Sequence, residues 1–320
     1  EELKDLSDAK QIAIDLETRD PNLTTIGSGS VRKDGEIVGI AVAVDGWSGY
    51  YPIAHEGGGN IDKKITLDWF KDILQTPATK IFHNAMYDVS WIRSLGFKIN
   101  GQIIDTMIAA SLVNENRLRY NLDSLAKEYV GIGKSEKLLY EAAKEWGVNP
   151  KKEMWRLPAM HVGEYAEQDA IATLKLWERL KQEITAQDLW DIFNVETELF
   201  PCLVDMKFKG VRVDLEKAHK IKKDLIKEEK QYLKKIKNET GLDVEIWAAA
   251  SIAKIFDKLK LPYDRTQTGA PSFTKNFLSQ HPNEVAQAIA QSREINKAHT
   301  TFIDTILEHE HNGRIHADIN

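Results

Sequence analysis

Acidic side chains in three separated segments are the residues whose types and spacing could support chemistry. The four carboxylates are Asp15 and Glu17 in I-A-I-D-L-E-T, Asp88 in N-A-M-Y-D, and Asp169 in Y-A-E-Q-D. Carboxylate oxygens are hard ligands that suit Mg²⁺ or Mn²⁺, so several of them without His or Cys point to divalent-metal chemistry on phosphates rather than to zinc. The set therefore favours a nuclease.

A lone D-x-E motif carries little information, and this chain has a second copy at Asp243 and Glu245. The residues around the first copy are what distinguish it. The apolar run Gln11 to Leu16 predicts a buried strand, on which residues two apart share a face. Asp15 and Glu17 would then project together from its end. An ordinary strand end with exposed acids is the alternative.

The second and third segments lie on predicted helices. Asp88 falls near the start of a helix expected from Tyr87 to Leu95, after a short strand at 79–83. Helix capping and the macrodipole favour a carboxylate there as well, so a structural Asp88 stays open. Tyr165 and Asp169 lie four residues apart in a helical pattern from about 160 to 187 and share one face, which continues into the core.

Taken in order, D-x-E, N-x-x-Y-D and Y-x-x-x-D closely resemble the three motifs of the DEDD superfamily of 3′→5′ exonucleases, in the subgroup with Tyr in the last motif. The resemblance covers residues from about 10 to 187. It implies an RNase H-like α/β domain with a mixed sheet. I-D-T-M at 104–107 and Y-N-L-D-S-L-A at 120–126 are similar to the connecting helices of that domain.

The resemblance also implies the metal ligands. It implies hydrolysis of the 3′-terminal phosphodiester with two Mg²⁺ or Mn²⁺ ions about 4 Å apart. Asp15, Glu17 and Asp169 would hold the ion that carries the attacking water. Asp15 would bridge to the second ion, and Asp88 would hold that ion.

Three further residues receive expected roles from the same resemblance. Tyr165 would orient the water through its hydroxyl, because an ordinary pKa near 10 makes it a poor base at neutral pH. Asn84 and Tyr87 would line the pocket for the terminal nucleotide. Single-stranded ends should be preferred because a paired terminus must first be frayed.

The segment at 195–214, V-E-T-E-L-F-P-C-L-V-D-M-K-F-K-G-V-R-V-D, resembles the block that follows the proofreading domain in family A (Pol I-like) DNA polymerases. Its own pattern predicts a helix that ends near Lys209, with Gly210 at the C′ position. T-G-A-P at 268–271 and R-I-H-A-D-I at 314–319 resemble the loop and strand that close the thumb of that family.

Two domains are therefore expected, an α/β exonuclease domain at 1–190 and a mainly helical thumb-like region at 191–320. Strands are expected near 10–16, 36–44, 48–53, 79–83 and 102–104. Helices of the second region are expected at 191–209, 215–239, 248–259, 273–280 and 283–309. No D-Y-S-x-x-E type block or H-D-E of a palm follows, so a fragment or one chain of a split polymerase is expected, with palm and fingers missing or separate.

The net charge of −6 suits a DNA-binding protein only if the basic residues are localised. Lysines crowd the helix expected at 215–239, and Lys220, Lys223 and Lys227 are the candidates for contacting a primer–template duplex. A solvated helix with acidic i,i+4 partners is the alternative. One cysteine, Cys202, excludes an internal disulfide framework, and no apolar run is long enough to span a bilayer. A cytoplasmic enzyme without membrane partners is expected.

Two other functions remain open. An RNA 3′-end trimming exonuclease would share the acidic segments but should lack the thumb-like region. A scaffold domain that has lost metal binding would lack a ligand, whereas all four carboxylates and Tyr165 are present.

Overall fold

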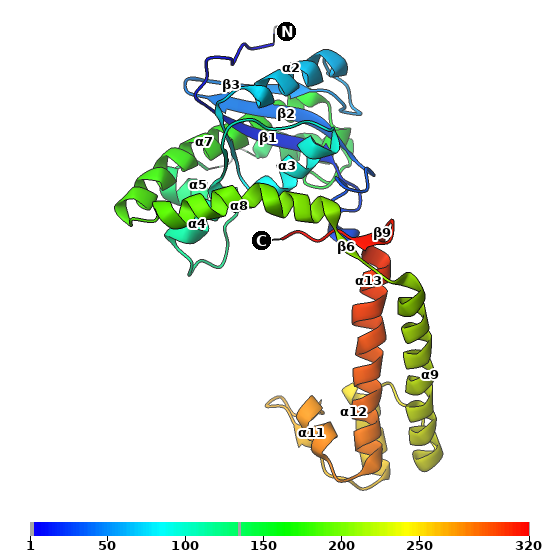
Figure 1. Ribbon diagram of the computed structural model, residues 1–320. Helices are drawn as coiled ribbons and strands as arrows, with labels where there is room; N and C mark the ends of the chain where they lie inside the picture. The colour runs from blue at the N-terminus through cyan, green and yellow to red at the C-terminus, as the bar shows by residue number, and fades with distance from the viewer. Residues whose placement is uncertain (1–2, 134–135, 320) are drawn as a thin grey trace. The chain divides into compact units, whose positions relative to one another are not determined.

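The computed structural model describes residues 3–133 and 136–319, which form two compact units (Figure 1). The first unit comprises the chain up to Lys209 together with the segment from Ala317 onward, and the second runs from Gly210 to His316. The expected boundary at 190/191 therefore falls at the start of a helix that belongs to the first unit.

A five-stranded mixed sheet is the centre of the first unit, in the order β3-β2-β1-β4-β5. Its strands are β1 (Gln11–Arg19), β2 (Glu36–Val44), β3 (Trp47–Pro52), β4 (Thr79–Phe82) and β5 (Ile103–Asp105). β1 pairs antiparallel with β2 and parallel with β4. β1 extends beyond the expected Leu16 because Thr18 and Arg19 continue the pairing with β2 after a register shift at Glu17/Thr18.

Alternation along β1 divides its side chains between two cores. Ile12, Ile14 and Leu16 pack into the cluster that contains Trp91 of the helix α3 (Ala85–Ser94), whereas Ala13 packs into the cluster built around the helix α7 (Gly163–Ala186). Successive strand residues point to opposite faces, so Asp15 and Glu17 share the α7 face with Ala13. The apolar pattern thus decides on which side the carboxylates stand.

Helices cover both faces of this sheet (Figure 1). The helices of the first unit are α1 (Leu23–Ile26), α2 (Lys63–Gln75), α3 (Ala85–Ser94), α4 (Thr106–Val113), α5 (Leu122–Val130), α6 (Lys137–Trp146), η1 (Met154–Arg156), η2 (Ala159–His161), α7 (Gly163–Ala186) and α8 (Trp190–Lys209). The segment I-D-T-M is only partly helical, because Ile104 and Asp105 end β5 before α4 begins at Thr106.

The helix α8 belongs to the first unit by its packing. Phe193 enters the cluster around α7, and Phe200 and Val204 enter the cluster on the other face of the sheet. Lys207, buried near the end of α8, pairs with Asp318, with 2.6 Å between Nζ and Oδ1. These contacts explain why the compact unit ends at Lys209 rather than at residue 190.

The second unit is mainly helical, with its own apolar core around Ile236, Phe256 and Ile289. Its elements are β6 (Val211–Arg212), α9 (Leu215–Thr240), α10 (Ala249–Lys258), β7 (Asp264–Arg265), β8 (Pro271–Ser272), α11 (Lys275–Gln280), α12 (Glu284–Lys297), the π-helical segment η3 (Ala298–Ile303), α13 (Asp304–His309), β9 (Glu310–His311) and β10 (Arg314–Ile315). The helix expected at 283–309 is thus interrupted by a π-helical turn. The expected thumb strand at 314–319 pairs with β6 only through Arg314 and Ile315.

Candidate active site

Asp15 and Glu17 stand on the α7 face of β1, as the strand pattern predicts. Their cross-strand partners in β2 are Ala41 and Gly39, which are small enough to leave room above this part of the sheet. β4 pairs with β1 only from Gln11 to Ala13, so the edge of β1 beside the two acids is not covered by that strand. Asp15 and Glu17 therefore project beside the part of β1 that β4 does not cover.

Asp88 comes to this part of β1 from the first turn of α3. Its side chain is 5% exposed, and the backbone N–H of Leu16 donates to its Oδ1 at 3.0 Å. Burial raises the pKa of Asp88 well above its ordinary value, and the negative charge of Asp15 raises it further. Asp88 is thus an electrostatic neighbour of the first motif.

α7 supplies Tyr165 and Asp169 from one helix face. Asp169 is 6% exposed, and Thr173 and Leu176 continue the same face into the core. Burial raises the pKa of the Tyr165 hydroxyl, and the charges of Asp169, Glu17 and Asp15 raise it further, in that order. The structure therefore places all five expected catalytic side chains in one electrostatic neighbourhood.

The chemistry of this donor set fits a divalent cation. The donors are carboxylate oxygens, and their mutual repulsion would be relieved by a positive charge held among them. Over residues 3–133 and 136–319, however, no three His, Cys, Asp or Glu side chains are grouped closely enough to hold an ion as they stand. Carboxylate oxygens are the kind of ligand that Mg²⁺ or Mn²⁺ prefers. In the described residues, however, the four carboxylates do not converge on a common point.

The two expected pocket residues have different surroundings. Asn84 is exposed, has a left-handed backbone with φ 64°, and lines a cavity of about 340 Å³ between α4 and α8. Tyr87 is half-buried, and its hydroxyl lies 2.6 Å from Thr18 Oγ1 and donates to Asp20 Oδ2 at 3.2 Å. Tyr87 is therefore attached to the end of β1, next to Glu17.

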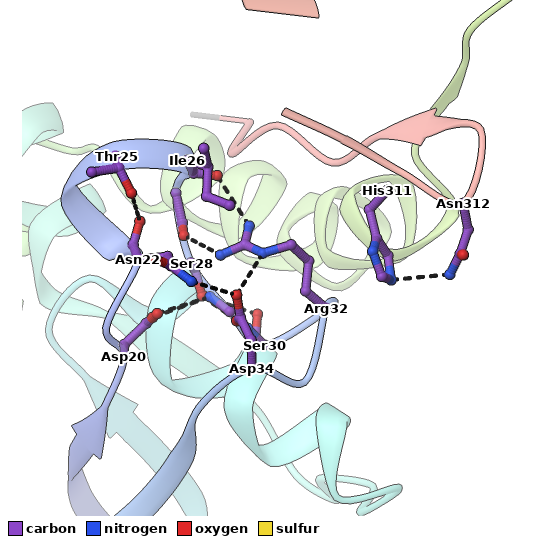
Figure 2. Close-up of polar contacts among 12 residues, drawn as sticks. Asp20, Asn22, Thr25, Ile26, Ser28, Ser30, Arg32, Asp34, His311 and Asn312 are labelled. Carbon is purple, nitrogen blue, oxygen red and sulfur yellow. Dashed lines mark hydrogen bonds and ion pairs between the residues drawn. The ribbon is translucent and has the colours of Figure 1, made fainter. Parts of the chain in front are cut away.

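A polar network orders the loop that follows β1 (Figure 2). The Arg32 guanidinium donates to Asp34 Oδ2 at 3.0 Å and to the carbonyl oxygens of Ile26 and Gly27. Asp20 accepts from the backbone N–H of Gly29 at 3.1 Å. Because Tyr87 also donates to Asp20, this loop and the start of α3 are held by one carboxylate.

Asp105 is a residue that sequence reasoning missed. It accepts hydrogen bonds from the backbone N–H groups of Asn84, Ala85 and Met107 at 3.0, 2.8 and 2.8 Å, and so caps the start of both α3 and α4. Burial raises the pKa of Asp105 to about 6. Asp105 lies inside the helix expected at 104–107, so the sequence carried no signal for this cap. Its bonds to the N–H groups of Asn84 and Ala85 explain why α3 begins at Ala85, two residues before the expected Tyr87.

The expected DNA-contacting lysines are exposed on α9 of the second unit. Within the described part of the chain, Lys220, Lys223 and Lys227 form no ion pair. Other lysines of the helix are paired, as Lys222 is with Asp304 and Lys237 is with Asp243. The alternative, a helix whose lysines form ion pairs with acidic residues four positions away, therefore does not describe these three lysines.

The family model described as the 3′-5′ exonuclease of family A DNA polymerases matches residues 1–185. The chain belongs to this exonuclease family. The match spans the four carboxylates and Tyr165, and it confirms the resemblance inferred from the three motifs. The expected class of enzyme, a 3′-5′ exonuclease of the DNA polymerase type, is confirmed with it.

Curated relatives of the exonuclease family extend the similarity over both units. The chain is 34% identical to a DNA-directed DNA polymerase of Pseudomonas phage M6, over 98% of this chain and 48% of that protein. It is 27% identical to DNA polymerase I of Pseudomonas aeruginosa, over 98% of this chain and 35% of that protein. The chain thus spans half or less of the length of these relatives.

A solved structure shows the same fold. The chain superposes on the POL domain of Pol1 from M. smegmatis, in complex with DNA primer-template and dNTP, with a TM-score of 0.71 and 18% identity. The match covers 98% of this chain and 49% of that one. The expected fold class, a mixed-sheet α/β domain followed by a helical region, is confirmed. None of the described helices is long and apolar enough to cross a bilayer.

Proposed function

We propose that this chain hydrolyses the 3′-terminal phosphodiester of DNA and acts as the proofreading part of a family A DNA polymerase. The observation that carries the proposal is the electrostatic neighbourhood of Asp15, Glu17 and Asp169 around the Tyr165 hydroxyl, with Asp88 as a neighbour of Asp15. The family match supports the reaction class. The DNA-bound complex of the structural relative supports DNA as the partner.

Each side chain has a role in this proposal. Asp15, Glu17, Asp88 and Asp169 would hold two Mg²⁺ or Mn²⁺ ions, which when bound would activate the attacking water and stabilise the leaving oxygen. Tyr165, which keeps its proton because its pKa is raised, would donate to the attacking water or accept from it and fix its position. Thr18 and Tyr87 would border the terminal nucleotide beside Glu17.

The second unit would contact the nucleic-acid backbone. Lys220, Lys223 and Lys227 follow spacings of three and four residues, so their ammonium groups lie along one face of α9. Exposed lysines without carboxylate partners are suited to phosphate contacts. We propose that this thumb-like region binds primer–template duplex.

The decisive test is degradation of a 5′-labelled single-stranded DNA oligonucleotide with Mg²⁺. Asp15→Ala and Asp169→Ala should abolish shortening while leaving the fold nearly intact, because removal of one carboxylate relieves repulsion but forfeits the ion. Asp243→Ala is the matched control, since it removes an acid from the second D-x-E, which lies in an exposed loop. Parental shortening by Asp15→Ala would refute the assignment.

The same assay separates the rival functions. An RNA oligonucleotide of the same sequence should be shortened much more slowly than DNA, and faster RNA degradation would favour the RNA-trimming alternative. A primed template with Mg²⁺ and four nucleoside triphosphates should give no extension by this chain. Absence of both shortening and extension would favour a scaffold.

A further inference from the structure

Tyr50 of β3 lies in the same cross-strand row as Asp15. Tyr50 is paired with Ala41 of β2, and Ala41 is paired with Asp15 of β1. Residues directly opposite in neighbouring strands project from the same face of a sheet. Tyr50 therefore stands on the α7 face, on the same side as the carboxylates.

Small residues of β2 let the phenol reach those carboxylates. Gly39 is the cross-strand partner of Glu17, and a Cβ at Gly39 would lie 2.0 Å from the Tyr50 hydroxyl oxygen. The hydroxyl thus occupies the space of the missing side chain, next to Glu17.

The direction of this hydroxyl is set by His55. The Tyr50 oxygen lies 2.5 Å from His55 Nε2, and His55 Nδ1 lies 3.1 Å from the carbonyl oxygen of Leu157. Burial lowers the pKa of His55 to about 4, so the ring is neutral at pH 7. Because a carbonyl can only accept, Nδ1 carries the hydrogen, Nε2 is the acceptor, and the Tyr50 hydroxyl donates to it.

The far end of this bridge is the segment that leads into α7. Backbone hydrogen bonds join the His55 loop to that segment, from Glu56 N–H to Trp155 O at 2.9 Å and from Ala159 N–H to Gly58 O at 3.0 Å. The Tyr50 ring also lies against Gly163, the first residue of α7, since a Cβ there would be 3.5 Å from Tyr50 Cδ1. Gly163 lies two residues before the catalytic candidate Tyr165.

We propose that Tyr50, held by His55, is a positioning residue that fixes the start of α7, and with it Tyr165, against Asp15 and Glu17. This role rests on the proposed exonuclease function. A neutral hydroxyl–imidazole bridge joins the two elements without adding a charge to an acidic site. Neither side chain belongs to the three acidic segments, and neither would touch the substrate in this role.

Tyr50→Phe tests the role because it keeps the ring and removes the hydroxyl. Turnover of single-stranded DNA with Mg²⁺ should fall by roughly tenfold or more, since a misplacement of about 1 Å can cost about 10²-fold. KM and the melting temperature should change little. His55→Ala should cause a similar fall in kcat, and the double variant should be no slower than the slower single variant, because the two residues act through one bridge.

His55→Gln supplies a rescue, because its amide can donate to Leu157 O while its oxygen accepts from Tyr50. It should recover most of the turnover that His55→Ala loses. Tyr51→Phe is the matched control: Tyr51 is the next residue of β3, points to the other face, and accepts from Lys4 N–H at 3.1 Å. Its turnover should stay at the parental value.

The outcomes separate this inference from the function on which it rests. Parental kcat in Tyr50→Phe, additive losses in the double variant, or no recovery in His55→Gln would each overturn the positioning role while the parental chain still shortened DNA. A parental chain that does not shorten DNA would overturn both the role and the proposed function. A KM effect with unchanged kcat would also reject positioning.

Discussion

Tyr165 keeps its proton through the neutral pH range, because burial and three nearby carboxylates all raise the pKa of its hydroxyl. A phenol that keeps its proton is unable to act as a general base, so the role that we propose for Tyr165 is geometric. Its position on α7, one turn before Asp169, places the two residues on one helix face.

Replacing Tyr165 with Phe should therefore lower kcat by about 10²-fold, the usual loss for one positioned catalytic hydroxyl. Binding of a single-stranded oligonucleotide should be unchanged, because the ring remains. Single-turnover kinetics and fluorescence anisotropy measure the two quantities. Tyr140→Phe, at an exposed position on α6, is the control. A weakened affinity with parental kcat would contradict the geometric role.

Asp105 is a structural carboxylate close to the proposed catalytic Asp88. Asp105→Ala should lower the free energy of unfolding by about 2 to 4 kcal/mol, because three backbone N–H groups lose their acceptor. Asp62→Ala, which removes a single exposed cap bond to Ile65 N–H, should cost about 1 kcal/mol. Urea unfolding compares the two, and equal losses would argue against the double-cap role.

At the scale of elements, β4 carries a buried lysine between two strands. Lys80 is fully buried, pairs with Ile12 and Ile103, and donates through Nζ to the carbonyl oxygens of Thr76 and Asn100. Burial lowers the pKa of Lys80 to about 8, from an ordinary value of about 10.4. The cationic form is therefore the costly one in the folded protein.

This lowered pKa predicts a pH dependence of stability. Between about pH 8 and pH 10.4 the unfolded chain binds the Lys80 proton more than the folded chain does, so the contribution of Lys80 to the free energy of unfolding rises with pH in that window. The difference in unfolding free energy between the parent and Lys80→Met should move in favour of the parent from pH 7 to pH 10. Lys71→Met, at an exposed position, should show no such trend.

The helix α9 has two classes of lysine, and they should differ in their effect on DNA binding. Changing Lys220, Lys223 and Lys227 together to Gln should weaken binding to a primer–template duplex and lower the slope of log K against log salt by roughly 2 to 3, because each phosphate contact contributes about 0.9. The matched triple variant changes the ion-paired Lys222, Lys235 and Lys237. Equal slopes in both variants would reject the phosphate contacts.

At the scale of the whole molecule, we expect the chain to shorten unpaired 3′ ends of DNA in preference to paired ones. Single-stranded and mismatched 3′ ends should be shortened faster than fully paired ends, because unpairing a base costs a few kcal/mol. Initial rates on three oligonucleotides that differ only in the terminal pairs measure this. Rates that do not depend on terminal pairing would contradict a site that accepts a frayed strand.

The chain also joins two units with separate apolar cores, one around the mixed sheet and one among α9, α10 and α12. Sequence patterns predicted the helices of the second unit closely, as α9 at Leu215–Thr240 shows. They missed the π-helical turn at Ala298–Ile303, because an i→i+5 segment leaves no periodic signal of its own. The domain boundary predicted at 190/191 falls at the start of α8. The packing of α8 against the first unit is a tertiary contact, which no local sequence pattern reveals.

The sequence by itself determined what depends on neighbouring residues. Asp15 and Glu17 share a face because a strand has a period of two, and Tyr165 and Asp169 share a face because a helix brings residues four apart together. These relations follow from backbone geometry, so the order and spacing of the motifs were enough to predict the family. The expected catalytic roles of these residues stay predictions.

Only the tertiary structure decided which distant segments meet. Asp88 reaches the first motif because β4 leaves the end of β1 uncovered, so that Leu16 N–H can donate to it. Tyr50 reaches Glu17 because the register of β2 places Gly39 between them. Strand order, register and the absence of a Cβ at Gly39 bring together residues that are far apart in sequence. No local pattern encodes these relations.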